Sequence, residues 1–199
     1  MSVGDAYFDE LFAGNDDPWS FRQRWYERRK RALTLAALPR ERFSAAFEPG
    51  CANGELAAEL AQRCDNLLCG DTSVAAVRLA RERLADFPHA RVEQMRLPQD
   101  WPGERFDLIV FSEVGYYLNR GDLLAVAERM RDSLDENGVL LACHWRHPIE
   151  GCPLDGDEVH RLLGDALGMH SLATHLEADF ILQLWSRDGL SVASREGLA

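Results

Sequence analysis

An acidic turn with two glycines follows the first strongly apolar run of the sequence. Glu48-Pro49-Gly50-Cys51-Ala52-Asn53-Gly54 comes directly after the apolar residues 43–47 and precedes a helical pattern. A glycine here lets the backbone approach a ligand that a Cβ would hold away, and the new helix directs its unpaired N–H groups at that ligand. A second apolar run ends at Asp71, roughly 20 residues on, where nucleotide-binding βαβ units carry an acid for the ribose. A plain tight turn would explain the glycines alone, but the combination predicts a nucleoside site.

The charge of Glu48 indicates which nucleoside the turn favours. Its carboxylate would repel a diphosphate but not a cationic aminoacyl-sulfonium, and such repulsion is strong at short range in a partly dry cleft. The turn lacks the three glycines of G-x-G-x-x-G, and no G-K-[ST] follows it. The pattern therefore favours S-adenosylmethionine (SAM) over NAD and argues against a P-loop. It resembles the E-x-G-x-x-x-G of class I SAM methyltransferases, with Glu48, Gly50 and Gly54 matching.

Composition limits the other possibilities. A chain of 199 residues suits one domain with one core, and no run of about 18 apolar residues suggests a membrane span. The formal charge of −11 argues against a nucleic-acid partner. The basic runs 22–24 and 28–31 are therefore interpreted as a solvated helix face rather than a binding patch. Five cysteines without a C-x-x-C, and no leader-like N-terminus, predict a reducing, cytoplasmic location.

Strands and helices alternate through most of the chain, which is typical of a parallel sheet covered on both faces. We expect strands at 43–48, 66–70, 91–95, 106–112 and 138–145, and helices at 54–63, 73–85 and 120–134. Asn137-Gly138 is a turn signal before the last of these strands.

The two ends of the chain differ from this alternation. After a helix at 155–167, the runs 169–176 and 179–187 predict an antiparallel hairpin at the sheet edge. Helices at 5–13 and 25–38 form an N-terminal extension, residues 1–38, that we expect to act as a lid. The predicted fold is thus a single α/β domain over 1–199, a doubly wound, mostly parallel seven-stranded sheet. Ligands bind such sheets at the carboxyl ends of the strands, where Glu48, Asp71, Arg96, Glu113 and Trp145 fall.

Five sequence blocks together resemble the nodulation protein S (NodS) family. They are Y-F-D-E-L-F at 7–12, D-P-W at 17–19, Y-E-R-R-K at 26–30, E-P-G-C-A-N-G at 48–54 and F-D-L-I-V-F-S-E-V-G-Y-Y-L at 106–118. The resemblance implies a Rossmann-like class I fold, SAM as methyl donor, and an amine as acceptor, on a deacetylated amino sugar or oligosaccharide. The chain departs from the family at Pro49, where Val is more usual, and nothing in it specifies the acceptor's length.

The turn and the resemblance together predict which residues hold SAM. Asp71 can accept two hydrogen bonds at once, which suits the ribose hydroxyls, although it could instead cap the helix that starts near Ser73. Residues 95–97 are expected to flank the adenine, with Arg96 either taking part or remaining a surface cation. The predicted cofactor-binding residues are Glu48, Gly50, Cys51, Gly54, Asp71, Thr72, Arg96, Leu97 and Ser112.

Glu113 and Tyr116 are the predicted catalytic residues. Methyl transfer needs a nitrogen lone pair aimed at the methyl group, and a carboxylate that accepts N–H bonds can orient a neutral amine and disperse the charge that develops on it. Glu113 could alternatively be a loop acid, or could hold the methionyl ammonium. One of Tyr116 and Tyr117 is expected to line the methyl path and the other to pack in the core. The predicted acceptor-binding residues are Trp19, Tyr117, Trp145 and His147.

Other interpretations stay open. Trp19, Trp25 and Trp145 could be sugar platforms or core residues, and His147 could be an auxiliary base. No cluster has metal-ligand spacing, so we expect no metal, and [DN]-P-P-[YFW], typical of nucleobase-amine methyltransferases, is absent. A SAM-dependent enzyme with a small-molecule O-acceptor and a non-catalytic SAM-fold protein are the alternatives. The intact Glu48 and Asp71 constellation counts against the second of these.

Overall fold

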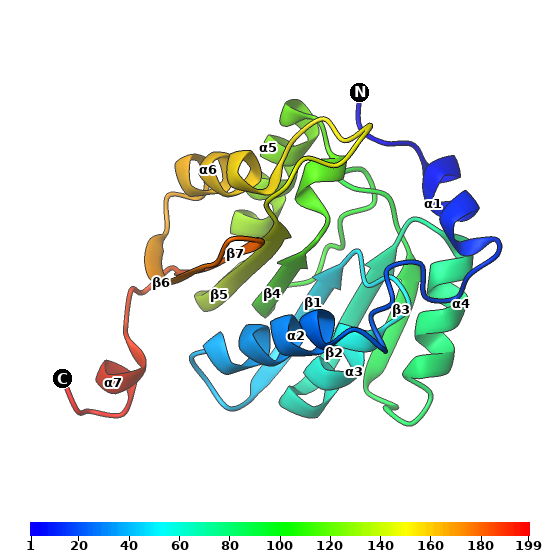
Figure 1. The fold of residues 1–199 in the computed structure, drawn as a ribbon. Helices are drawn as coiled ribbons and strands as arrows, with labels where there is room; N and C mark the ends of the chain where they lie inside the picture. The colour runs from blue at the N-terminus through cyan, green and yellow to red at the C-terminus, as the bar shows by residue number, and fades with distance from the viewer.

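Seven strands form one sheet with the order β3-β2-β1-β4-β5-β7-β6 in the computed structural model, which describes all 199 residues (Figure 1). The first five strands are parallel: β1 (Phe43–Pro49), β2 (Cys64–Asp71), β3 (Ala90–Gln94), β4 (Phe106–Ser112) and β5 (Leu134–Trp145). β6 (His170–Leu176) and β7 (Phe180–Ser186) form an antiparallel hairpin that pairs through β7 with β5. The doubly wound sheet and its edge hairpin are confirmed.

Helices cover both faces of the sheet. α2 (Trp25–Ala37), α3 (Glu55–Leu60) and α4 (Val74–Arg83) pack on one face, and α5 (Arg120–Ser133) and α6 (Gly156–Leu167) on the other. The short α1 (Asp5–Phe12) packs against α4, and α7 (Val192–Arg195) lies apart from the sheet near the C-terminus (Figure 1). Short 3-10 turns, η1 (Ala61–Arg63) and η2 (Gly115–Tyr117), follow α3 and β4. None of these helices has the length and apolar character needed to cross a bilayer.

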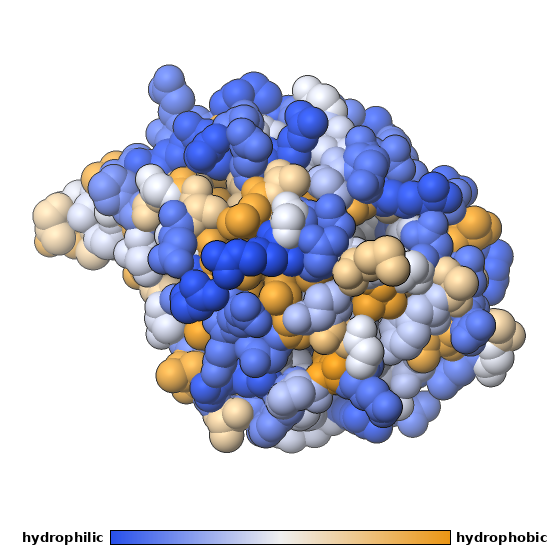
Figure 2. Space-filling view, turned by 90° about the horizontal axis from the view of Figure 1, so that it is seen from above, coloured by the Kyte–Doolittle hydropathy of each residue, from blue (hydrophilic) through white to orange (hydrophobic).

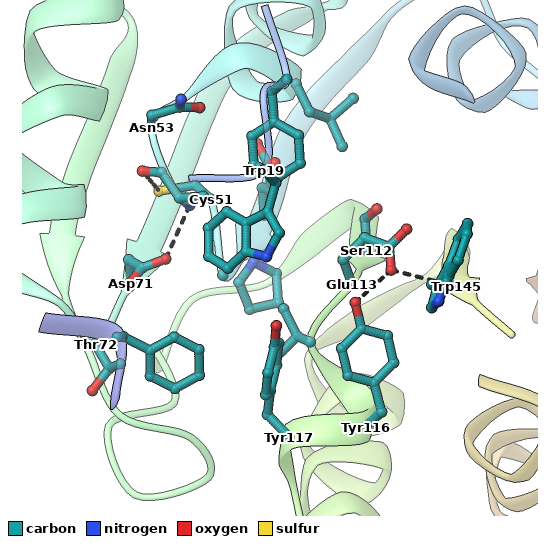
Figure 3. A pocket seen from close by; sticks show the side chains of 18 of the residues that line it. Trp19, Cys51, Asn53, Asp71, Thr72, Ser112, Glu113, Tyr116, Tyr117 and Trp145 are labelled. Carbon is teal, nitrogen blue, oxygen red and sulfur yellow. Dashed lines mark hydrogen bonds between the residues drawn. The ribbon is translucent and has the colours of Figure 1, made fainter. Parts of the chain in front are cut away.

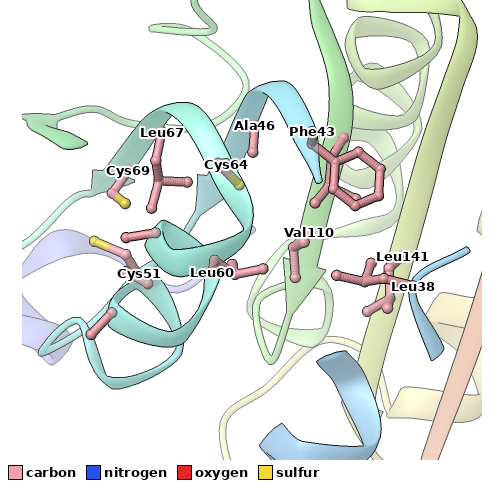
Figure 4. Packing of buried hydrophobic residues seen from close by; sticks show 14 of the residues in the cluster. Leu38, Phe43, Ala46, Cys51, Leu60, Cys64, Leu67, Cys69, Val110 and Leu141 are labelled. Atoms are coloured by element: carbon pink, nitrogen blue, oxygen red, sulfur yellow. The ribbon is translucent and has the colours of Figure 1, made fainter. Parts of the chain in front are cut away.

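The central strands are apolar on both faces because both faces are covered. In β1, Ala46 faces the α2–α4 layer and Phe47 the α5–α6 layer, and in β4 the same alternation holds for Leu108 and Ile109. All four residues are at most 1 % exposed. Figure 4 shows the α2–α4 side of this packing, where Phe43 and Leu38 lie near the far end of the sheet from the turn at Cys51.

The predicted turn at Asn137-Gly138 is wrong, because these residues lie inside β5, which begins at Leu134. Phe106 pairs with Leu134 while Leu108 pairs with Val139, so the extra residues of β5 are accommodated as a bulge. Asn and Gly suit a bulge as well as a turn, but a bulge does not end the strand. The sequence pattern alone therefore does not distinguish a bulge within β5 from a turn before it.

The N-terminal segment crosses the carboxyl-terminal edge of the sheet. The Val3 amide donates to the carbonyl oxygen of Tyr117 at 2.8 Å, and the Asn119 amide donates to Ser2 Oγ at 2.8 Å. Further along, Thr72 Oγ1 donates to Asp5 Oδ1 at 2.6 Å. The segment is therefore tied to the ends of both β2 and β4.

Candidate active site

A cavity of about 640 Å³ lies at the carboxyl ends of β1, β2, β4 and β5 and is covered by the N-terminal segment. Such a volume is within the usual range for small-molecule sites. Figure 2 views the molecule from above, the side to which β1 and β4 point, and shows apolar residues between hydrophilic ones there. All of the predicted site residues except Gly54 and His147 line this cavity.

The glycine turn is shaped by contacts with the ends of β2 and β4. Gly50 has a φ of +77°, and a Cβ on it would lie 2.1 Å from Val114 Cγ2. The amides of Gly50 and Cys51 donate to the carbonyl oxygen of Gly70 at 2.7 and 3.0 Å. Only glycine fits at position 50, and it brings the backbone to the edge of the cavity.

Gly54 has a different place from the one expected. It caps the N-terminus of α3 with a φ of +82°, and a Cβ on it would lie 3.0 Å from Ala80 Cα in α4. It lies outside the cavity lining. Gly54 therefore serves the turn and the close packing of α3 on α4. The sequence motif alone does not distinguish a glycine needed for such packing from a glycine that contacts the ligand.

Glu48 lies at the end of β1 as a buried acid without a partner. Its side chain lines the cavity, the residue is 3 % exposed, and Oε2 has no hydrogen-bond partner. Burial and, secondarily, the charge of Asp71 hold the pKa of Glu48 well above its usual value. Because a buried polar atom normally has a partner, the orphaned oxygen fits a ligand that brings a cationic N–H group. It does not fit a phosphate.

Asp71 holds the glycine turn against the start of α4. Its Oδ2 accepts from the Ala52 amide at 2.9 Å (Figure 3), and its Oδ1 accepts from the Ser73 amide at 3.0 Å. The side chain of Ser73, not Asp71, caps α4 by accepting from the Ala76 amide. Burial raises the pKa of Asp71, and the backbone N–H bonds oppose that shift. Each oxygen keeps a lone pair for two adjacent hydroxyls, as a ribose would present.

The adenosine side of the cavity is linked to α1. Arg96 Nε lies 2.8 Å from Asp5 Oδ2, and Thr72 binds the other oxygen of the same carboxylate. Leu97 and the buried Met95 line the cavity beside them. Arg96 is thus both cavity-lining and paired with the N-terminal helix, although its side chain is 63 % exposed.

Glu113 is anchored more firmly than the sequence suggests. Its Oε2 accepts from Tyr116 O–H at 2.6 Å and from the Trp145 amide at 2.9 Å (Figure 3), and its Oε1 accepts from Lys30 Nζ at 2.5 Å. The residue has a φ of +59°, a conformation that costs about 1–3 kcal/mol in a non-glycine residue and is concentrated at functional sites. The carboxylate is therefore held in one orientation by three donors from three elements.

The interpretation of residues 28–31 as a solvated helix face is wrong for Lys30 and Arg31. Both are buried together with Glu27, and all three line the cavity. Lys30 Nζ contacts Glu113 and Glu27 and lies 5.1 Å from the centre of the Tyr26 ring. Burial alone would lower the pKa of Lys30, but Glu113 and Glu27 raise it above its usual value. The i, i+3, i+4 spacing of positions 27, 30 and 31 was the available signal that they share one face.

The aromatic residues form two groups around the cavity. Trp19 stacks on Phe21 with ring centres 5.4 Å apart, and Tyr117 packs edge-on against Phe8. On the opposite side, Trp145 lies edge-on to Tyr26 at 5.7 Å. Tyr116 and Tyr117 are both buried and both line the cavity, so neither is confined to the core.

Two of the predicted candidates lie elsewhere. Trp25 is 68 % exposed and is absent from the cavity lining. His147 is half-exposed and is absent from the cavity lining, although its Nε2 contacts Oδ1 of Asp179, which lines the cavity, at 2.9 Å. No group of three or more His, Cys, Asp or Glu side chains is arranged to hold a metal ion.

A buried histidine chain supports the loop that carries Glu113 and Tyr116. The Gly115 amide can only donate, so His144 Nε2 accepts from it at 3.0 Å and the proton of this neutral ring lies on Nδ1. His144 Nδ1 then donates to His160 Nε2 at 3.1 Å, and His160 Nδ1 donates to Gln183 Oε1 at 2.8 Å. Burial lowers the pKa of both rings, that of His160 to about 4. The chain connects η2 to α6 and β7.

Residues 9–177 match the profile of a family described as nodulation protein S (NodS). The chain is 35% identical over 109 residues to nodulation protein S of Rhizobium tropici, which covers 54% of this chain and 45% of that protein. It is 31% identical over 143 residues to nodulation protein S of Sinorhizobium fredii, which covers 71% of this chain and 63% of that protein. The matches thus span about half to three-fifths of the length of these relatives.

Two crystal structures are similar over nearly their whole length. One is a protein from Pseudomonas syringae assigned as a methyltransferase, 61% identical with a TM-score of 0.75, covering 82% of this chain and 100% of that one. The other is the N-methyltransferase NodS from Bradyrhizobium japonicum in complex with S-adenosyl-L-homocysteine (SAH). It is 25% identical with a TM-score of 0.82, covering 91% of this chain and 96% of that one. The fold is that of class I methyltransferases.

Replacing Glu48 by Gln should separate ligand binding from stability. Loss of a charge-assisted hydrogen bond of about 1.5–3 kcal/mol predicts roughly ten- to a hundredfold weaker SAH binding by calorimetry.

The raised pKa of Glu48 means that its contribution to stability is present below the unfolded pKa and is lost as pH rises through the folded pKa. The melting temperature of ligand-free Glu48→Gln should therefore increase relative to the wild type as pH rises. The exposed Glu93→Gln is the control, and SAH affinity unchanged in Glu48→Gln would contradict this assignment.

Proposed function

The chain belongs to the nodulation protein S (NodS) family, and on that premise we propose that it is a SAM-dependent N-methyltransferase. Its acceptor is an amine, carried by a deacetylated amino sugar or oligosaccharide. One observation carries this proposal: the buried, unpartnered carboxylate of Glu48 shares a cavity with the anchored carboxylate of Glu113. The first suits a cationic nucleoside and the second an amine. The B. japonicum relative, an N-methyltransferase crystallised with SAH, supports the combination of a SAM-type cofactor with an amine acceptor.

The sheet side of the cavity binds SAM in this proposal. Glu48 accepts N–H bonds from the methionyl ammonium, and the backbone at Gly50 and Cys51 passes beside it. Asp71 accepts the two ribose hydroxyls with the lone pairs that Ala52 and Ser73 leave free. Thr72, Arg96, Leu97 and Ser112, which line the same cavity, enclose the nucleoside and the sulfonium.

The opposite side of the cavity orients the acceptor. SAM supplies a methyl group on a positively charged sulfur, which is open to in-line attack by a nitrogen lone pair. Glu113 keeps one lone pair beyond its three donors, and it orients the amine and stabilises the positive charge that develops on nitrogen. Tyr116 fixes the Glu113 carboxylate through its hydroxyl. Holding both reactants in contact supplies a large part of the rate.

Aromatic rings on two sides of the cavity bind the sugar. Trp19, Tyr117 and Trp145 line the cavity from three parts of the chain and present apolar faces on which a pyranose can stack. His147 lies outside the cavity, and we assign it no role. The five free cysteines support a reducing, cytoplasmic location.

Labelled SAM with matched acceptors tests the reaction. We expect methyl transfer to deacetylated chitooligosaccharides and none to the fully acetylated ones, since acetylation removes the basic lone pair. Asp71→Ala should abolish transfer by removing SAM binding, which calorimetry can measure separately. Transfer to hydroxyl acceptors in place of amines would contradict an N-methyltransferase and support the O-acceptor class.

We further propose that residues 1–38 close over bound SAM as a lid. They supply α1 and α2 to the cavity and are tied to its far side by the bonds of Ser2 and Val3. Ligand binding should therefore slow tryptic cleavage at the exposed Arg22 in the α1–α2 connection several-fold. Cleavage at exposed Arg187, in the C-terminal segment, is the internal control. Equal cleavage at Arg22 with and without SAH would argue against closure.

A further inference from the structure

We infer that Glu27, on α2, takes the proton from the acceptor's ammonium and so frees the nitrogen lone pair for methylation. The inference rests on the proposed function, because only an amine acceptor needs this step. Aliphatic and sugar amines bind a proton near neutral pH, and the protonated form has no lone pair to attack carbon. A site that uses such acceptors needs a proton acceptor within reach of the nitrogen.

Two carboxylates share the buried ammonium of Lys30 unequally. Lys30 Nζ lies 2.5 Å from Glu113 Oε1, but 3.2 Å from Glu27 Oε2 and 3.4 Å from Glu27 Oε1. Glu113 also receives the Tyr116 hydroxyl and the Trp145 amide. Glu27 has no other hydrogen-bond donor. Most of the capacity of Glu113 is thus committed, whereas Glu27 keeps lone pairs for a proton.

The position of Glu27 suits an encounter with the acceptor. It lines the cavity with Tyr26 and Lys30, and its side chain is only 11 % exposed. It contacts the same ammonium as Glu113, so the two carboxylates lie close to each other around one Nζ atom. The Tyr26 hydroxyl is buried without a hydrogen-bond partner. Because Tyr26 lines the same cavity, its orphaned hydroxyl is a further polar group there that a polar ligand can satisfy.

The local charge favours a cationic acceptor. Glu27 and Glu113 are two acidic groups beside the single basic group of Lys30. Arg31 does not neutralise them, because its guanidinium binds Glu59 and the carbonyl oxygen of Phe21. Burial raises the pKa of Glu27, with Lys30 opposing and Glu113 reinforcing the shift. A carboxylate with increased proton affinity is a better base for an amine than an exposed one.

The step balances within the site. An N–H bond of the ammonium breaks, its electron pair stays on nitrogen, and the proton forms an O–H bond with Glu27. The resulting amine is neutral, and its lone pair becomes available for the methyl group. The methylated product carries its own positive charge, so no second proton need leave. The proton on Glu27 returns to solvent when the product departs.

The pH profile of Glu27→Gln tests the inference, with a deacetylated chitooligosaccharide as acceptor. Without the base, only acceptor that binds already neutral can react. kcat/KM should therefore fall about tenfold for each unit that the pH lies below the acceptor's pKa, and should recover as the pH approaches that pKa. The wild type should show a flatter profile over the same range. Glu27→Asp should recover part of the wild-type behaviour, and the exposed Glu128→Gln on α5 should match the wild type.

SAH affinity by calorimetry serves as the control that Glu27→Gln is folded and loaded. If it binds SAH but keeps the wild-type pH profile, at whatever rate, Glu27 is a structural partner of Lys30 and the inference is overturned. If Glu27→Gln does not fold, Glu27→Ala, which also lacks the carboxylate, is measured instead, and a wild-type pH profile in that variant overturns the inference. Glu113→Gln should lose rate at every pH, without recovery at high pH. The proposed function fails separately, when the wild type itself methylates no amine.

Discussion

A carboxylate that is buried without a partner constrains the whole ligand-binding edge of this protein. Glu48 ends β1 beside Asp71, and burial is the main cause of the raised pKa of each. Burying such groups costs free energy unless a ligand or partner satisfies them. A cationic group restores the missing interaction, whereas a phosphate adds a further negative charge. A ligand that reaches Glu48 must also pass close to the backbone of the turn, and glycine at position 50 allows this close approach.

Glu113 lies where the two halves of the site meet. The sheet supplies Glu48, Asp71 and Glu113, and the N-terminal helices supply Glu27 and Lys30. The Lys30–Glu113 pair joins them at 2.5 Å. Because a buried pair of this kind needs both members, the Glu113 side of the cavity is complete only with α2 in place. Below it, the His144 chain fixes the backbone of the loop that carries Glu113.

The sequence predicts the sheet and the glycine turn well because both follow from local patterns. Apolar runs identify β1, β2 and β4, and an acid at or next to the carboxyl end of each strand identifies the ligand edge. It does not reveal the partnership of Lys30 with Glu113, since these lie 83 positions apart and a charged helix face is normally solvated. The bulge of β5 and the His144–His160 contact likewise depend on tertiary packing. Whether Gly54 touches a ligand or a helix also depends on that packing, which a motif does not specify.

Competition between ligands of opposite charge tests the central claim most directly. Calorimetric titrations with SAM, SAH and NAD at neutral pH should give tight binding of the two sulfur nucleosides. NAD, with its pyrophosphate directed at the glycine bend, should bind at least about a hundredfold more weakly. If NAD binds as tightly as SAH, the acidic floor of the cavity does not select its ligand, and the account is contradicted.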